Sequence, residues 1–312
     1  MLELRDRVRN EVRKVVVGQD EVIDALLIGL GARGHVLLEG PPGTAKTLLA
    51  NAVARALGLT FRRAQFTPDL LPSDLTGTMT LVGGAVGELS FRAGPVFTNV
   101  LLADEINRTP PKTQAALLEA MGEAQVTVDG TTHPLPDPFF VVATQNPIEY
   151  EGTYPLPEAQ LDRFTMKVDV SAPTKDQEMA MLRLRHEGVR PATLDDVQAV
   201  CTRSDLVRVR SDIDDTTVTE SVLEYIVDVV RATRQLPAVA LGGSPRAAVQ
   251  LLAASKAHAR IVGRPFATPD DVAAMARPVL RHRLVLRPEA EMERYRPDDL
   301  VAAALASVTV PR

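Results

Sequence analysis

The sequence lacks the features that mark several specialised classes of protein. Only one of its 312 residues is a cysteine, Cys201, so an internal disulfide is excluded and no cysteine spacing typical of a metal site exists. The five histidines are scattered without ligand spacing. No apolar run reaches the length of a membrane span, and residues 1–6 contain no signal-peptide core. We therefore expect a cytoplasmic protein without stable membrane insertion.

The composition is that of an ordinary globular protein. Hydrophobic residues make up 45% and charged residues 24% of the chain, and the net charge is −5. A chain of this length has room for two domains with a sizeable core. The mild acidic excess argues against broad non-specific binding to nucleic acid, although it leaves a local basic patch open.

The most informative stretch is residues 40–47, with the sequence GPPGTAKT. Residues 34–39 before it predict a buried parallel strand, and residues 48–57 after it predict a helix. Strand, glycine-rich turn, Lys-Thr pair and helix form the context of a phosphate-binding P-loop. Backbone N–H groups and the helix N-terminus would face an anion. Lys46 would add charge at the β- and γ-phosphates, and the Thr47 hydroxyl would bind Mg²⁺.

Two glycine patterns need separate interpretation. The strict P-loop pattern has glycine where this chain has Ala45, so the motif alone leaves an ordinary helix N-terminus as the alternative. Residues 29–34 fit G-x-G-x-x-G, which is typical of dinucleotide sites when it follows a strand and opens a helix. Here the pattern closes a predicted helix and precedes a strand, so we interpret it as a helix end and loop.

Polar side chains follow the next two predicted buried strands. Asp104 and Glu105 directly follow the strand predicted over residues 100–103, and Asn146 comes two residues after the strand predicted over residues 139–144. Beside a P-loop, Asp104 would hold Mg²⁺, Glu105 would polarise the attacking water and Asn146 would orient it. Without a P-loop, a solvated strand end and a turn-forming Asn before Pro would explain the same residues.

The element pattern predicts two domains. Strands alternate with helices to about residue 172, which predicts an α/β domain with a parallel sheet between helices. Residues 67–95 predict a functional insertion, and residues 125–133 predict a hairpin around Asp129-Gly130. Residues 173–312 predict a second, mostly helical domain. The helices expected along the chain are 3–16, 21–30, 48–57, 111–124, 174–187, 194–203, 219–236, 245–262 and 269–281.

With these blocks in order, the chain resembles the MoxR family of AAA+ ATPases. The matching blocks are residues 40–47, 65–74, 91–97, 101–108, 143–147, 151–164 and 243–247. They cover nearly the whole chain, and the alanine-containing P-loop is typical of that family. The resemblance implies an AAA+ P-loop core at residues 1–172, followed by a smaller all-α lid domain at residues 173–312.

The resemblance also implies a role for each site residue. ATP or ADP would be bound by Gln19 at the adenine and by the Walker A residues Gly40, Pro41, Pro42, Gly43, Thr44, Ala45, Lys46, Thr47 and Leu48. Mg²⁺ would be held by Thr47 and Asp104. Glu105 resembles the Walker B base and Asn146 resembles sensor 1. Arg163 resembles the arginine finger that reaches the neighbouring subunit, and Arg246 resembles sensor 2, on a lid helix over the phosphates of its own chain. Guanidinium groups suit the charge of a γ-phosphoryl group, although a surface salt bridge is the alternative for each.

The resemblance further implies a hexameric homo-oligomeric ring. Residues 67–95 resemble the helix-2 insertion and residues 125–133 the pre-sensor-1 hairpin, which line the pore in related machines. The expected function is Mg²⁺-dependent ATP hydrolysis that remodels client proteins, with von Willebrand factor A-type partners and a role in cofactor or metal insertion.

Three other functions stay open at the level of sequence. They are the motor subunit of a metal chelatase, a nucleic-acid-dependent motor, and a nucleotide switch without turnover. The hairpin tip Asp129-Gly130-Thr131 and the absence of Lys and Arg from residues 125–133 argue against nucleic acid. Glu105, Asn146 and Arg163 argue against a switch.

Overall fold

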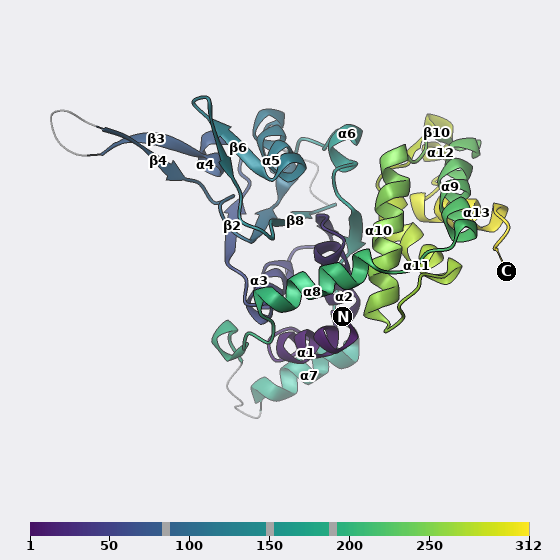
Figure 1. Cartoon of the computed structure of the whole chain (residues 1–312), viewed down its shortest axis with the longest axis horizontal. Helices are drawn as coiled ribbons and strands as arrows, with labels where there is room; N and C mark the ends of the chain where they lie inside the picture. The colour runs from purple at the N-terminus through teal and green to yellow at the C-terminus, as the bar shows by residue number, and fades with distance from the viewer. Residues whose placement is uncertain (83–87, 148–152, 187–191, 312) are drawn as a thin grey trace.

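A parallel sheet of five strands lies at the centre of the chain (Figure 1). The computed structural model describes residues 1–82, 88–147, 153–186 and 192–311. The strands, in spatial order, are β2 Phe61–Gln65, β5 Val100–Asp104, β8 Phe140–Gln145, β1 Val36–Glu39 and β9 Met166–Asp169. Every neighbouring pair runs parallel, so all five strands end at the same edge of the sheet. The predicted α/β fold with a parallel sheet is confirmed.

The sheet separates two hydrophobic cores, because successive strand residues point to opposite faces. Val36 and Leu38 of β1 join the core on one face, and Leu37 between them joins the core on the other. The helices of the first face are α1 Leu2–Val12, α2 Asp20–Gly31 and α3 Lys46–Ala56, and α5 Pro111–Glu123 covers the second. Burial on both faces explains the continuous apolar runs of the central strands.

Two antiparallel hairpins extend from the α5 side of the sheet. One is formed by β3 Gly77–Val82 and β4 Glu88–Ala93 after the short helix α4 Pro72–Thr76, and it projects at the left of Figure 1. The other is formed by β6 Gln125–Val128 and β7 Thr131–Pro134. The rings of Phe91 and His133 stack with centroids 3.9 Å apart and join the two hairpins. The hairpin predicted around Asp129-Gly130 is confirmed, with φ angles of +48° and +77° that suit a two-residue turn.

The carboxyl-terminal part is mostly helical, as predicted. Its elements are α9 Glu220–Gln235, β10 Val239–Leu241, α10 Pro245–Ile261, α11 Pro269–Leu280, β11 Val285–Leu286, α12 Pro288–Met292 and α13 Pro297–Ser307. Helix α10 packs against α2, and α11 packs against β9. The core on the α1–α3 side therefore continues into α9, α10, α11 and α13. The boundary at residues 172 and 173 stays a prediction.

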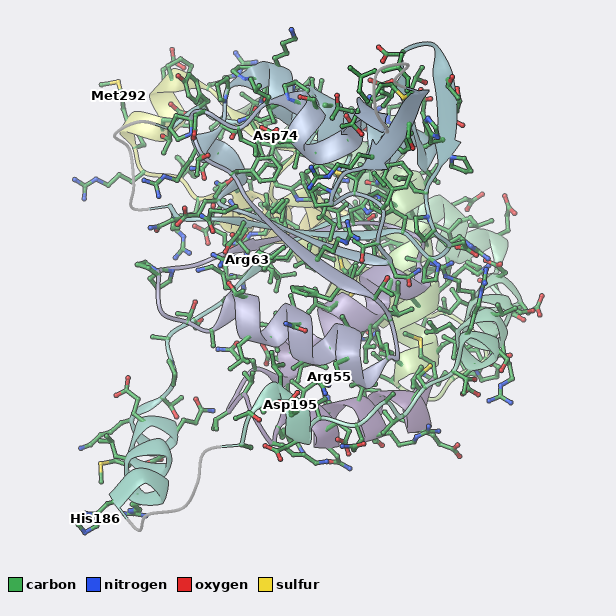
Figure 2. The ribbon with its side chains drawn as sticks, turned by 90° about the vertical axis from the view of Figure 1, so that its left-hand side faces the viewer. Arg55, Arg63, Asp74, His186, Asp195 and Met292 are labelled. Carbon is green, nitrogen blue, oxygen red and sulfur yellow. The ribbon has the colours of Figure 1, made fainter. Side chains whose placement is uncertain are left out.

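The segment between the two parts departs from expectation. It contains α7 Lys175–His186, the 3₁₀ turn η2 Leu194–Asp196 and α8 Arg203–Asp214. Two short elements within the α/β part are η1 Ile106–Arg108 and α6 Glu158–Leu161. In Figure 2, α7 stands away from the body of the protein with His186 at its far end. No helix within the described residues is long and apolar enough to cross a bilayer.

The helix predicted over residues 194–203 is wrong, and α8 was not predicted. The backbone of this segment bonds to its neighbour, because the N–H of Val200 donates to the carbonyl oxygen of Ala56 at 2.8 Å. Asp195 pairs with Arg55 of α3 at 3.0 Å (Figure 2). A regular helix begins only after Thr202, whose hydroxyl accepts the N–H of Asp205 at 3.2 Å. The sequence also predicted a first helix that ran to residue 16, and it missed the short strands β10 and β11.

Candidate active site

The P-loop connects β1 to α3 at the carboxyl edge of the sheet. Gly40 lies against Val170, which directly follows the neighbouring strand β9. A Cβ at position 40 would be 2.3 Å from the carbonyl oxygen of Val170, which excludes a side chain. Thr44 Oγ1 donates to the carbonyl oxygen of Pro41 at 3.0 Å. Ala45 takes the left-handed conformation, with φ +61° and ψ +23°, directly before α3. The alanine thus adopts the backbone conformation that a glycine adopts more easily.

Lys46 lies in the first turn of α3 and reaches back across the loop. Its Nζ donates to the carbonyl oxygens of Gly40 and Pro41, each at 2.8 Å. Burial lowers the pKa of Lys46, while Asp104 and Glu105 favour its charged form and oppose that shift. A partly desolvated ammonium beside a helix N-terminus is suited to bind phosphate.

Asp104 and Thr47 fit a magnesium ion. Asp104 is the last residue of β5, is 7% exposed, and its Oδ2 lies 3.2 Å from Thr47 Oγ1. Adjacent oxygen ligands of octahedral Mg²⁺, each at about 2.0–2.1 Å from the ion, are about 3 Å apart. Thr144 of the neighbouring strand donates to Asp104 Oδ1 at 2.5 Å and fixes the carboxylate.

Glu105 is held by its backbone and by its side chain. It takes a left-handed conformation at φ +58°, and its N–H donates to Thr144 Oγ1 at 2.9 Å. Its Oε2 accepts from Gln65 Nε2 at 2.6 Å and from Arg108 NH1 at 2.9 Å. A non-glycine residue in this region is uncommon and often marks a functional site. The carboxylate is therefore oriented by donors on two elements.

Strand β2 supplies two side chains that the sequence analysis missed. Gln65 binds Glu105, and Arg63 forms an ion pair with Asp104 at 2.7 Å between its NH2 and Oδ2. The available signal was polar residues two apart in a strand, which places Arg63 and Gln65 on one face. Their target could not be read from the sequence, because β2 and β5 are neighbours only once the strand order is known.

A cavity of about 430 Å³ joins these groups. It is lined by Pro42, Gly43, Thr44, Ala45, Lys46, Thr47, Leu48, Asp104, Glu105, Thr144, Gln145 and Asn146. The predicted P-loop residues, the acidic pair and Asn146 thus meet in one place. Gly40 and Pro41 do not line the cavity, but their carbonyl oxygens accept hydrogen bonds from Lys46 Nζ, which does.

Gln19 lies beside the P-loop and outside the lining of this cavity. It is 8% exposed, and its Nε2 donates to the carbonyl oxygen of Ser171 at 3.1 Å. Ser171 follows Val170, whose backbone contacts Gly40. Its predicted contact with adenine stays a prediction.

Arg163 and Arg246 lie away from this cavity, and neither is among the described residues that line it. Arg163 precedes β9, and its NH1 donates to the carbonyl oxygen of Leu118 on α5 at 2.9 Å. Arg246, in the first turn of α10, is exposed, and burial together with the charge of Arg246 lowers the pKa of His35 to about 4. His35 directly precedes β1, whereas the P-loop follows β1. Ser244, two residues before Arg246, donates to Asp162, which directly precedes Arg163, so both arginines start from backbone near the edge opposite the P-loop.

Arg246 was expected over the phosphates of its own chain, and it is not among the described residues that line this cavity, so its role stays a prediction. The start of α10 lies near the amino-terminal edge of the sheet, because Ser244 before α10 donates to Asp162 ahead of β9. Lid docking depends on packing between distant segments, so spacing in the sequence did not predict it.

The comparisons with known proteins extend over nearly the whole chain. Residues 35–166 match the "ATPase family associated with various cellular activities (AAA)", and residues 231–304 match the "AAA lid domain". The chain is 46% identical over 300 residues to protein YeaC of Bacillus subtilis, covering 96% of this chain and 92% of that protein. It is 43% identical over 311 residues to Chaperone MoxR1 of Mycobacterium tuberculosis, covering 97% of this chain and 81% of that protein. The crystal structure of a candidate ATPase from Cytophaga hutchinsonii has 43% identity and a TM-score of 0.90, covering 100% and 97%.

Proposed function

Because the chain belongs to the MoxR family of AAA+ ATPases, we propose that it hydrolyses ATP with Mg²⁺ and uses the free energy to remodel client proteins. The observation that carries the proposal is the convergence of Lys46, Thr47, Asp104, Glu105 and Asn146 on one cavity. These side chains come from the ends of two parallel strands, β5 and β8, and from the helix after the P-loop, and they match the needs of phosphoryl transfer to water.

Each residue has a distinct task in this proposal. Lys46 and the N–H groups at the start of α3 bind the β- and γ-phosphates. Thr47 and Asp104 hold Mg²⁺, which when bound neutralises charge on the phosphate oxygens. Glu105 takes the proton of the attacking water, and Asn146 orients that water. The contacts from Gln65 and Arg108 aim the Glu105 carboxylate.

The geometry supports catalysis in an assembly. The arginines nearest the cavity, Arg63 and Arg108, are paired with Asp104 and Glu105, whereas the segments that carry Arg163 and Arg246 meet near the opposite edge of the sheet. We infer a closed homo-oligomeric ring, a hexamer by family resemblance, in which one subunit presents both arginines to the next subunit's cavity. Arginine fingers contribute about 10³–10⁵-fold to turnover in well-studied nucleotide hydrolases.

The β3–β4 hairpin favours a protein client. Leu81 and Leu89 are direct cross-strand partners on it and are 74% and 61% exposed. Apolar side chains on a projecting element suit contact with other proteins, whereas a nucleic-acid surface needs basic residues. By family resemblance we include von Willebrand factor A-type partners and assistance in cofactor or metal insertion.

The test is ATP turnover by the purified protein, measured as phosphate release with and without Mg²⁺. Lys46→Ala should lose nucleotide binding. Glu105→Gln should keep binding and lose about 10²–10⁴-fold in turnover, because it removes the base and leaves the metal site. Wild-type turnover by Glu105→Gln would show that Glu105 is not the base. Glu105→Gln locked with ATP should also capture clients and partners from native cells.

A further inference from the structure

The segment that carries Arg163 is held by side chains of the carboxyl-terminal part. Arg283, 5% exposed, follows α11, and its Nε donates to Asp162 Oδ1 at 2.8 Å. Its NH2 donates to the carbonyl oxygen of Phe164 at 2.6 Å. His282 Nε2 donates to the same carbonyl oxygen at 3.0 Å. Arg163 thus lies between two residues that Arg283 binds.

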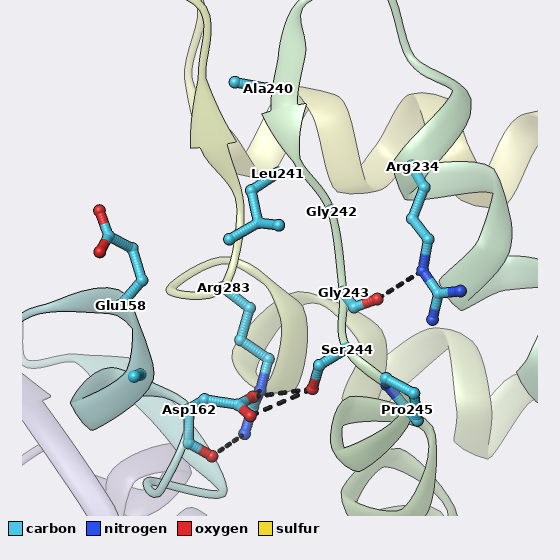
Figure 3. Close-up of a pocket in the computed structure, with 11 residues that line it drawn as sticks. Glu158, Asp162, Arg234, Ala240, Leu241, Gly242, Gly243, Ser244, Pro245 and Arg283 are labelled. Atoms are coloured by element: carbon cyan, nitrogen blue, oxygen red, sulfur yellow. Dashed lines mark hydrogen bonds and ion pairs between the residues drawn. The ribbon is translucent and has the colours of Figure 1, made fainter.

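The same carboxylate reaches the helix that carries Arg246. Ser244 precedes α10, and its Oγ donates to the two Asp162 oxygens at 3.2 and 3.1 Å. The N–H of Ala247 donates to Ser244 Oγ at 3.2 Å, which fixes the first turn of α10. Figure 3 shows Ser244 and Arg283 converging on Asp162 from two elements. We name Asp162, Ser244 and Arg283 the Asp162 clamp.

Polar contacts connect the end of α6 to the carboxyl-terminal part, beside the apolar core that the two parts share. The clamp lines a cavity of about 700 Å³ between α6 and the carboxyl-terminal part, with Arg234 and Leu241 on its far side. An unfilled space of this size leaves its walls without close packing partners. Arg283 is nevertheless buried and charged, so its hydrogen bonds must hold it in one orientation.

We propose that the Asp162 clamp positions Arg163 and Arg246 as one unit, so that both arginines enter a neighbouring subunit's ATP site together. The inference rests on the proposed function, because it gives the two arginines a target in the next subunit. No clamp residue is among the described residues that line the ATP cavity of its own chain. The clamp residues are therefore positioning residues that act through Arg163 and Arg246.

The first experiment separates ATP binding from turnover. Arg283→Gln and Asp162→Asn should bind ATP with nearly the wild-type Kd, and their kcat should fall at least tenfold because the arginines lose their shared anchor. The matched control is Arg264→Gln, which removes another lid arginine paired with a buried aspartate, Asp271, at 2.5 Å. This control should lose thermal stability and keep its kcat. An unchanged kcat in both clamp variants, or an equal loss in the control, would overturn the proposal.

The second experiment mixes variants to test whether the arginine pair acts on the ATP cavity of the neighbouring subunit. A clamp variant has an intact ATP cavity and a misplaced arginine pair, whereas Lys46→Ala has the reverse. In equal mixtures assembled at random, about one interface in four pairs an intact cavity with an intact arginine pair. Turnover should therefore recover when a clamp variant is mixed with Lys46→Ala and should not recover with Arg163→Ala. Recovery with Arg163→Ala, or none with Lys46→Ala, contradicts the clamp.

A control mixture separates this inference from the proposed function. Arg163→Ala with Lys46→Ala tests the shared site alone, in rings shown to contain both variants. If turnover does not recover in this control mixture, the shared site is refuted. If it recovers here but the clamp variants do not recover with Lys46→Ala, only the clamp is refuted. If Arg283→Gln and Asp162→Asn do not fold, Ser244→Ala removes a single donor to Asp162 and should show the same pattern with a smaller loss.

Discussion

Ala45 is predicted to be a position where glycine would stabilise the protein. Its φ of +61° lies in the left-handed region, which costs an L-residue about 1–2 kcal/mol. Glycine avoids that cost but loses about 0.5–1 kcal/mol more backbone entropy on folding. The difference predicts that Ala45→Gly raises the free energy of unfolding by about 0.5–1 kcal/mol.

Two other alanines provide controls, one expected to stabilise and one expected to destabilise the protein when replaced by glycine. Ala124, exposed at the end of α5 with φ +50°, should also gain stability on replacement by glycine. Ala115, exposed in the middle of α5, should lose about 1 kcal/mol, because glycine is a poor helix former. The three substitutions remove the same methyl group, so backbone conformation accounts for the difference between them.

The assay is thermal and urea unfolding of the three variants, together with ATP turnover. A change of 1 kcal/mol should shift Tm by about 1.5 °C in a chain of 312 residues, because the entropy of unfolding is about 2.1 cal/mol/K per residue. Ala45→Gly should also retain turnover, because glycine is the residue of the strict P-loop pattern. The reasoning fails if Ala45→Gly lowers Tm as Ala115→Gly does.

Three further predictions concern the active site and the pH dependence of stability. Arg163→Ala should bind ATP as the wild type does and lose about 10³-fold in kcat, as measured by equilibrium binding and phosphate release; weakened binding would place Arg163 in its own ATP site. Single- and double-stranded DNA should leave ATP turnover unchanged at physiological salt, and a several-fold stimulation with a steep salt dependence would favour a nucleic-acid motor. Burial holds the pKa of His35 at about 4, so the unfolded chain takes up that proton first as pH falls. The contribution of His35 to the free energy of unfolding should therefore be complete above pH 6.5 and should fall by up to about 3 kcal/mol between pH 6.5 and 4. Urea titrations at several pH values should show that the free energy of unfolding of His35→Gln changes less steeply with pH over this range.

Much of the site could be predicted because it depends on short-range order. A strand followed by glycine-rich residues, Lys46 and Thr47 specifies a local turn, and parallel strands place Asp104 and Asn146 at the same edge. Arg63 and Gln65 were missed because their partners depend on the order of strands, which no local pattern contains. The position of Arg246 relative to the cavity could not be predicted for a similar reason, since it depends on how α10 packs against α2.

The apolar cluster shared by the sheet, the first three helices and α9–α11 has a mechanical consequence. A hinge through this cluster would expose apolar side chains to water, at a cost of about 25 cal/mol for each Å². Stiffness of this kind disfavours bending inside a subunit. In the proposed ring, each subunit would then turn as a whole during ATP turnover, and the movement would arise at the interfaces between neighbouring subunits.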